Sequence, residues 1–136
     1  MSYGIAAALQ EAVYGALTAD TTVATLSGGA IHDALPRVPV PDLYVSLGPE
    51  QARDRSDKTG AGALHDFPVT VVTDGAGFHA AKVLAAAISD VLTGANLTLS
   101  RGQVVYLRFL RARARQRKDR RDIELWFRAH VDENTS

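Results

Sequence analysis

The feature that most constrains the fold is a strict two-residue alternation near the end of the chain. Over 121–132 the odd-numbered positions from Ile123 to Val131 are apolar, and the even-numbered positions are mainly polar. Successive side chains of a β-strand point to opposite faces, so this pattern predicts a strand with one buried and one open face. Trp126 is the one large apolar residue on the polar face, where either an interface or a covering loop would account for it.

A second strand is expected over 103–115, and the two strands are expected to form a hairpin. Leu107 and Phe109 belong on the same face as Phe127. Odd-numbered positions of one strand should therefore lie opposite odd-numbered positions of the other, and the turn around 117–119 should hold an odd number of residues.

The same register determines where the arginines of the hairpin point. It places Arg111, Arg113 and Arg115 on the core-side face, but beyond its apolar part. It also sets Arg115 opposite Arg121, a like-charge pair that destabilises an isolated chain. We therefore predict a basic hairpin tip over 111–121 that projects from the domain and needs partners from outside the chain.

The remaining pattern predicts an α+β fold in a single domain, 1–136. An apolar residue at every fourth position, from Ile5 to Leu17, favours a helix that Ser2 can cap. Residues 19–42 are predicted to form a short helical turn followed by a loop. The expected fold is a mainly antiparallel four-stranded sheet packed by two helices, in the order α-β-β-α-β-β. Its helices span 3–18 and 76–93, and its strands span 43–47, 64–73, 103–115 and 121–132.

Residues 49–63 are polar and contain several charges in close succession, among them Arg53, Arg55 and Lys58. Such a segment has too little apolar surface to order itself, so it is predicted to be a long mobile loop with a functional role. Pro68 lacks the N–H that a sheet ladder needs, which favours an edge strand or a bulge at that point.

Charge is balanced overall but unevenly distributed along the 136 residues. Residues 101–121 hold nine of the fifteen Lys and Arg residues and one acid, Asp119, which leaves most acids in the rest of the chain. Opposed charges in one neutral chain favour subunits that pair with copies of themselves, and a nucleic-acid patch over 108–121 is the alternative. Tyr106 and Phe109 precede the run from Arg111 to Arg121 and do not interrupt it, whereas a stacking platform for bases would need aromatic residues interleaved with the arginines.

No pattern in the chain is typical of catalysis, of a cofactor or of a membrane span. The chain has no cysteine, its four histidines show no metal-ligand spacing, and no apolar run reaches the 18 residues that a membrane span needs. It begins without a secretory signal pattern, so synthesis and folding in a reducing cytoplasm are expected. A small enzyme using His65 or His79 in a pocket is the weakest hypothesis, because no motif supports it.

Several phrases of the chain resemble the tail-completion family of long-tailed phages, which includes members from prophages and gene transfer agents. The resemblance covers roughly 3–131. The phrases are Ile31-His32-Asp33-Ala34-Leu35-Pro36, Pro41-Asp42-Leu43-Tyr44-Val45-Ser46-Leu47-Gly48, His65-Asp66-Phe67-Pro68-Val69-Thr70-Val71-Val72 and Ile123-Glu124-Leu125-Trp126-Phe127-Arg128-Ala129.

The resemblance implies a tail terminator, a structural subunit that forms a ring with copies of itself, usually six. The ring would end the tail tube, join the tail tube protein to the head-connector or stopper protein, and enclose the channel through which DNA passes. Such a subunit would be made in the bacterial cytoplasm and end in the tail of a phage-like particle. The residues expected at its subunit or partner interface are Arg53, Arg55, Lys58, Arg111, Arg113, Arg115, Arg117, Arg121 and Trp126.

Overall fold

The computed structural model describes residues 3–32, 42–55, 62–74, 77–93, 95–116 and 119–133. These residues form three helices and one six-stranded sheet, so the α+β class and the mainly antiparallel pairing are confirmed. The elements are α1 (Ala6–Ala19), α2 (Thr21–Ser27), β1 (Ile31–His32), β2 (Leu43–Leu47), β3 (Gln51–Asp54), β4 (Gly62–Thr73), α3 (Phe78–Leu92), β5 (Gln103–Gln116) and β6 (Arg121–Asp132).

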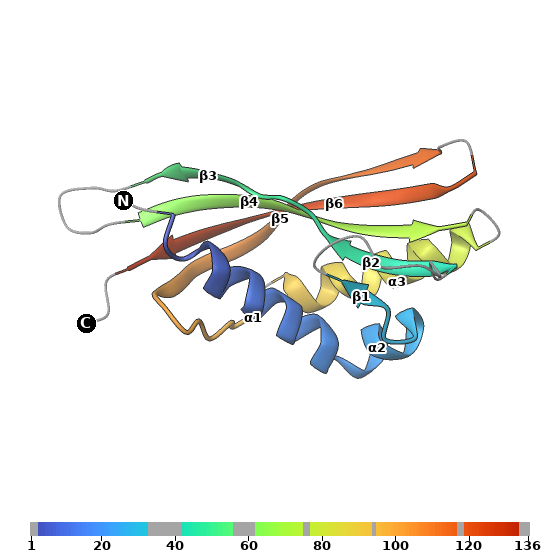
Figure 1. Cartoon of the computed structure of the whole chain (residues 1–136), viewed down its shortest axis with the longest axis horizontal. Coiled ribbons are helices and arrows are strands. Elements are labelled where there is room, and N and C mark those ends of the chain that lie inside the picture. The colour runs from blue at the N-terminus through green and yellow to red at the C-terminus, as the bar shows by residue number, and fades with distance from the viewer. Residues whose placement is uncertain are drawn as a thin grey trace.

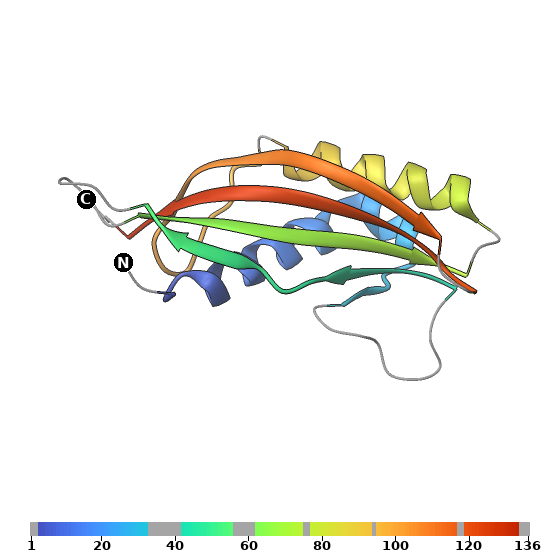
Figure 2. The ribbon, with the colours of Figure 1, turned by 90° about the horizontal axis from the view of Figure 1, so that it is seen from above.

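The two strands at the centre of the sheet, β4 and β6, are each 12 residues long. They pair antiparallel along their whole length, from Gly62 with Asp132 to Thr73 with Arg121. The strand order is β1-β2-β4-β6-β5, and β3 pairs with β4 on the same edge as β2. All three helices lie on one face of this sheet, which leaves the other face without helices (Figure 1, Figure 2).

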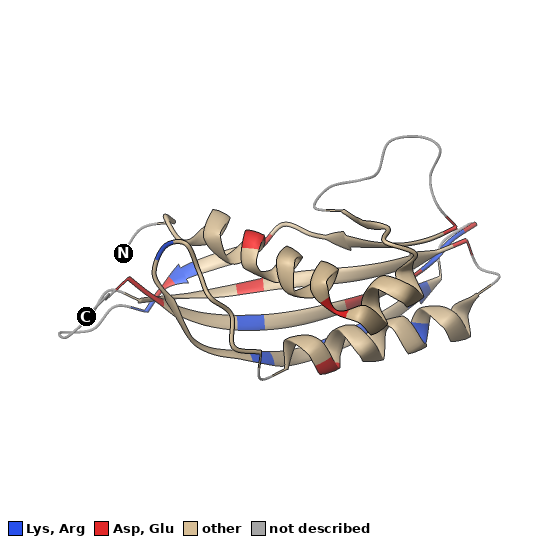
Figure 3. Cartoon of the chain, turned by 90° about the horizontal axis from the view of Figure 1, so that it is seen from below, with Lys and Arg blue, Asp and Glu red and all other residues tan. Residues whose placement is uncertain are grey.

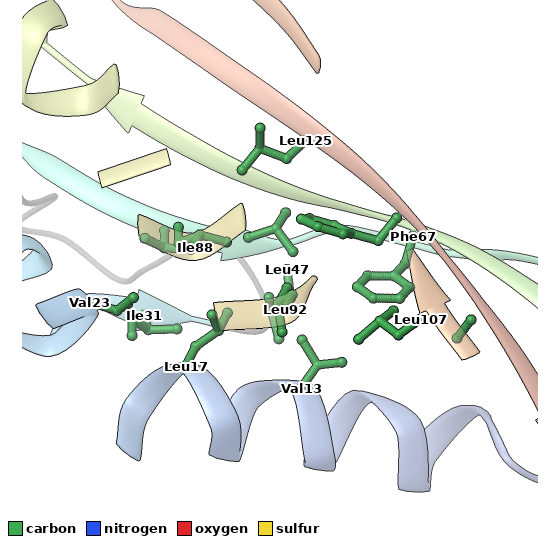
Figure 4. Packing of buried hydrophobic residues seen from close by; sticks show 14 of the residues in the cluster. Val13, Leu17, Val23, Ile31, Leu47, Phe67, Ile88, Leu92, Leu107 and Leu125 are labelled. Atoms are coloured by element: carbon green, nitrogen blue, oxygen red, sulfur yellow. The ribbon is translucent and has the colours of Figure 1, made fainter. Parts of the chain in front are cut away.

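The core lies between the sheet and the helices, as the periodic patterns predict. Leu9, Val13 and Leu17 of α1 are buried in a stripe that contacts the inner face of the sheet, and Figure 4 shows Val13 and Leu17 pointing toward it. The odd-numbered side chains of β6 are buried in the same cluster. Phe127 is 0% exposed, and its ring lies 5.8 Å from that of Phe67 and 5.8 Å from that of Phe109, measured between centroids.

Helix α2 is the short helical turn expected after the first helix. Its N-terminus is capped by Asp20, whose Oδ2 accepts a hydrogen bond of 3.0 Å from the N–H of Val23. It ends at Gly28, which has a φ of 64°, the left-handed conformation that glycine adopts without strain. Strand β1, which the pattern does not predict, follows this turn and pairs in parallel with β2.

The mobile loop predicted over 49–63 is wrong for its two ends. Gln51–Asp54 forms β3 on the edge of β4, and the last two residues of the range already belong to β4. All four residues of β3 are exposed, so this strand is held by main-chain hydrogen bonds to β4 and not by the burial of its side chains. Hydrophobic patterning could not reveal it, and 56–61 lies outside the described residues.

Pro68 lies in a central strand, at the position where the neighbouring edge strand is interrupted. Residues before Pro68 pair with β3, residues after it pair with β2, and its carbonyl accepts a hydrogen bond of 3.0 Å from the N–H of Gly48. A side chain at Gly48 would meet the proline ring at 2.7 Å, so glycine permits this close approach. The missing proline donor therefore coincides with the gap between β2 and β3.

The register predicted for the hairpin holds only from Tyr106 to Phe109, between two register shifts of β5. Phe109 pairs with Phe127 as expected, but a β-bulge follows and Arg111 pairs with Trp126. One extra residue moves every later side chain of β5 to the opposite face. The arginines after the bulge therefore lie on the face without helices, where the prediction placed them on the core side.

The hairpin tip is part of the sheet and does not project as a separate arm. Strand β6 stays paired with β4 as far as Arg121, and Gln116 pairs with Arg121 across residues 117–120, an even number where an odd turn was predicted. Arg115 lies opposite Asp122, so the predicted like-charge pair with Arg121 does not form. The guanidinium of Arg121 lies 4.9 Å from the ring centroid of Phe78, at the start of α3.

The position of Phe127 between two other rings predicts a large effect of truncation. Phe127→Ala should lower the free energy of unfolding by about 3–5 kcal/mol, because it removes buried apolar contacts and leaves a cavity. Phe109→Ala is the matched control: its ring packs against that of Phe127 but is 40% exposed, so its loss should be clearly smaller. Urea unfolding followed by circular dichroism measures both values, and equal losses would contradict this account of the core.

Candidate subunit interface

The sheet face without helices carries three of the arginines that the sequence singles out, Arg111, Arg113 and Arg115. We call it the open face. Its residues are the even-numbered positions of β6 together with their partners on β4 and β5. On β5 these partners are Gln103, Tyr106, Arg108, Arg111, Arg113 and Arg115. The helices screen none of them, so this face is available for contacts with other molecules (Figure 2).

Two of the predicted interface arginines have partners within the chain. The guanidinium of Arg111 lies 5.1 Å from the ring centroid of Trp126, and the Trp126 Nε1–H donates a hydrogen bond of 2.7 Å to Glu124. Arg115 contacts Asp122 at 3.3 Å and Glu124 at 3.5 Å. The expectation that these arginines lack partners in their own chain is wrong, because the bulge brings them beside the carboxylates of β6.

Arg113 differs from its two neighbours on β5. It is exposed, and it makes no ion pair, hydrogen bond or ring contact with the residues that the structure describes. Arg108 is also exposed, and its guanidinium lies 5.2 Å from the ring centroid of Tyr106. Both side chains stand on an edge strand, so their donors can reach beyond the sheet.

Sequence reasoning missed the strongest ion pair of the open face. Arg128 of β6 donates two hydrogen bonds to the Asp66 carboxylate of β4, from Nε at 2.7 Å and from Nη2 at 2.9 Å. The bond from Arg128 holds the pKa of Asp66 below its ordinary value, with smaller contributions from the charges of Arg53 and Arg111. The two residues are 62 positions apart, so only the register of β4 on β6 brings them together.

Of the remaining predicted interface residues, two lie at the sheet edge opposite β5. Arg53 on β3 and Arg55 just after it are exposed on the edge opposite β5. Arg121 contacts α3, as described above. Lys58 and Arg117 lie outside the described residues. The structure therefore does not bring the predicted residues into one patch.

A cleft of about 430 Å³ lies between α1 and β1, at the sheet edge opposite β5. Its described lining includes Glu11, Tyr14 and His32, and Tyr14 is 40% exposed. Sequence reasoning did not single out this cleft, because Glu11 and Tyr14 are on the outward side of a helix and resemble ordinary surface residues. The cleft and the arginines of β5 lie at opposite edges of the sheet.

His65, one of the two histidines weighed for catalysis, is fully buried on β4 beneath the first turn of α1. Its ring stacks on Tyr3 with 6.3 Å between centroids, and neither ring nitrogen has a hydrogen-bond partner among the described residues. Burial lowers the pKa of His65, so the ring is held neutral. His79 is exposed near the start of α3. No part of the described structure groups three potential metal ligands.

No helix among the described residues is long and apolar enough to cross a membrane.

Asp66→Asn tests the ion pair across the two central strands. The pKa of Asp66 is lower in the folded chain than the 3.8 of the unfolded chain, so its stabilising effect is complete above that value and is lost as pH falls through the folded pKa. The variant should unfold a few degrees below the wild type at neutral pH, and the gap should close well below pH 3.8. Thermal unfolding by calorimetry measures it, with Asp90→Asn on the exposed side of α3 as control.

His65→Leu tests the cost of the unpartnered ring. Because the folded pKa lies below 6.5, the unfolded chain takes up a proton first, and the wild type loses stability as pH falls below 6.5. The variant has no such loss and no unpaired buried nitrogen, so its relative stability should rise as the buffer is made more acidic. Thermal unfolding measured as the pH is lowered through 6.5 tests this prediction, with His79→Leu as control. A difference in stability between wild type and His65→Leu that does not change with pH would contradict the account.

Comparisons with known proteins agree with one another along nearly the whole chain. The family model described as Tail completion protein gp17 matches residues 11–132. A solved structure described as the virion of a native gene transfer agent particle contains a chain 57% identical to this one, with 96% of this chain and 99% of that chain covered and a TM-score of 0.91. A search of the curated proteins returned no match. The chain therefore belongs to the tail completion protein gp17 family.

Proposed function

We propose that this protein is a tail terminator, a structural subunit whose ring ends the tail tube of a phage-like particle. The observation that carries the proposal is the match to a chain of a gene transfer agent virion, 57% identical over 96% of this chain. At this identity, coverage and TM-score the two chains have the same fold. The name of the family, tail completion protein, supports the same role.

The geometry of the sheet supports assembly into a ring. A ring needs two different surfaces on each subunit, so that every copy contacts one neighbour with the first surface and another neighbour with the second. Strand β5 is open on one edge of the sheet, and β1 and β3 are open on the other. Six copies, each in contact with two others, would close such a ring around a channel.

In this proposal the partners are further copies of the chain, the tail tube protein on one side and the head-connector protein on the other. DNA passes through the channel without sequence-specific contact. The subunit is made in the bacterial cytoplasm and is built into the tail, and its role is structural, with no reaction to catalyse and no cofactor.

The alternative, binding of nucleic acid by 108–121, is less well supported by the open face. Asp66, Asp122 and Glu124 lie among the arginines, and Arg115 already contacts two carboxylates. A phosphate backbone would meet these acidic groups as well as the basic ones. Surfaces that contain both charges suit a protein partner better.

Removal of the gene from cells that make the particle tests the proposal. We expect filled heads and unattached tails, because nothing would then end the tube or join it to the connector. Electron microscopy of the particles measures attachment, and the plasmid-borne gene should restore it. Mass measurement of the assembly at the tube end should correspond to six copies of the chain. Normally attached tails in cells without the gene would contradict the proposal.

A further inference from the structure

The β5 edge of the sheet and the part of the far edge that α1 and β1 build differ in charge as well as in position. Strand β5 forms one edge and carries Arg108, Arg111 and Arg113, and β1 forms the far edge beside α1. Residues 3–32, which build α1, α2 and β1, contain two acids and no lysine or arginine. Figure 3 shows the acidic position on α1 and the absence of basic ones along that helix.

The cleft between α1 and β1 has the chemistry that a guanidinium group requires. Glu11 offers a carboxylate that can accept two parallel hydrogen bonds. Tyr14 offers the face of an exposed ring, which attracts a cation. His32 Nε2 is buried at the cleft without a hydrogen-bond partner among the described residues. The cleft of about 430 Å³ has room for an arginine side chain.

Arg113 is the arginine of β5 best suited to leave its own subunit. Arg111 stacks on Trp126, and Arg115 is held by two carboxylates, so both are committed within the chain. Arg113 lies between them on the same face, is exposed and has no contact of this kind with the described residues. Its neighbours fix the backbone of the strand, so only the Arg113 side chain has to be ordered when it meets an incoming molecule.

We propose that the β5 edge of one copy docks on the α1–β1 edge of the next copy, with Arg113 in the cleft and its guanidinium paired with Glu11. The inference rests on the proposed ring and names its repeated contact. Because the two surfaces lie at opposite edges of the sheet, each copy uses both, once toward each neighbour.

A second copy fits the cleft better than another class of partner does. The chain has 15 basic and 15 acidic residues and no net charge; the segments that build α1, α2 and β1 contain no lysine or arginine, whereas β5 carries four arginines. A phosphate polymer would be attracted by β5 and repelled by the cleft, so it would leave one edge unused. A copy of the chain brings both complementary surfaces in one molecule.

Reversal of the two charges tests the contact. Glu11→Arg alone and Arg113→Glu alone should each lower the number of particles with attached tails at least tenfold in cells that lack the gene, because each creates a like-charge pair at every subunit contact. The double variant restores opposite charges and should recover attachment to within about threefold of the wild type. Asp90→Arg, an equal reversal on exposed α3, should leave attachment unchanged.

Each outcome separates the contact from the proposed function. If the wild-type gene restores attachment and the single reversals do so equally well, the contact is wrong while the ring stands. If the single reversals fail and the double variant fails with them, although circular dichroism shows folded protein, the two residues do not meet. If deletion of the gene leaves attachment normal, the terminator function itself is wrong. Loss of duplex DNA binding in Arg113→Glu, with Glu11→Arg fully active, would assign β5 to nucleic acid.

The absence of cysteine allows a direct measurement of proximity. A variant with Glu11→Cys and Arg113→Cys, treated in assembled particles with a bis-maleimide long enough to replace both side chains, should give a ladder of linked chains up to the full ring. Either single cysteine variant should give none beyond a dimer. The paired positions lie at opposite sheet edges of one copy, so a ladder reports contacts between copies, and its absence in attached tails would overturn the contact.

Discussion

The antiparallel pairing of β4 with β6 is the contact on which the rest of the structure depends. It joins 12 residues of each strand without a break, and every other strand except β1 is attached directly to one of these two. Its inner side chains form the floor of the core, among them Phe67 and Phe127, and its outer side chains include the pair of Asp66 with Arg128. The same ladder therefore fixes the position of the core and the layout of charge on the open face.

The β-bulge after Phe109 determines what the chain can offer to a partner. Without it, the later arginines of β5 would face the helices, where burial of their charges would be costly. With it, they stand beside the carboxylates of β6, which neutralise Arg115 and leave Arg113 exposed. One inserted residue thus converts a destabilising arrangement into a basic edge that remains compatible with a folded subunit.

Edge strands also explain how a small sheet can serve an assembly. An unpaired edge is an aggregation hazard, and charged residues and bulges are the usual protection. Strand β5 has both, with arginines along it and two register shifts. These features disfavour random strand pairing and still permit a specific contact of the kind that the proposed ring requires.

The sequence by itself determined the fold class, both long helices, the limits of β2 and β6 and the buried stripe of α1, because each depends on a local period of apolar residues. The resemblance of its phrases also identified the family. The tertiary structure alone decided the bulge, the pairing of exposed β3 and the meeting of Asp66 with Arg128. These depend on main-chain hydrogen bonds and on contacts between residues far apart in the sequence. Neither produces a repeating spacing of apolar residues. The strand order likewise placed the cleft beside Glu11 and the arginine edge on opposite sides of one sheet.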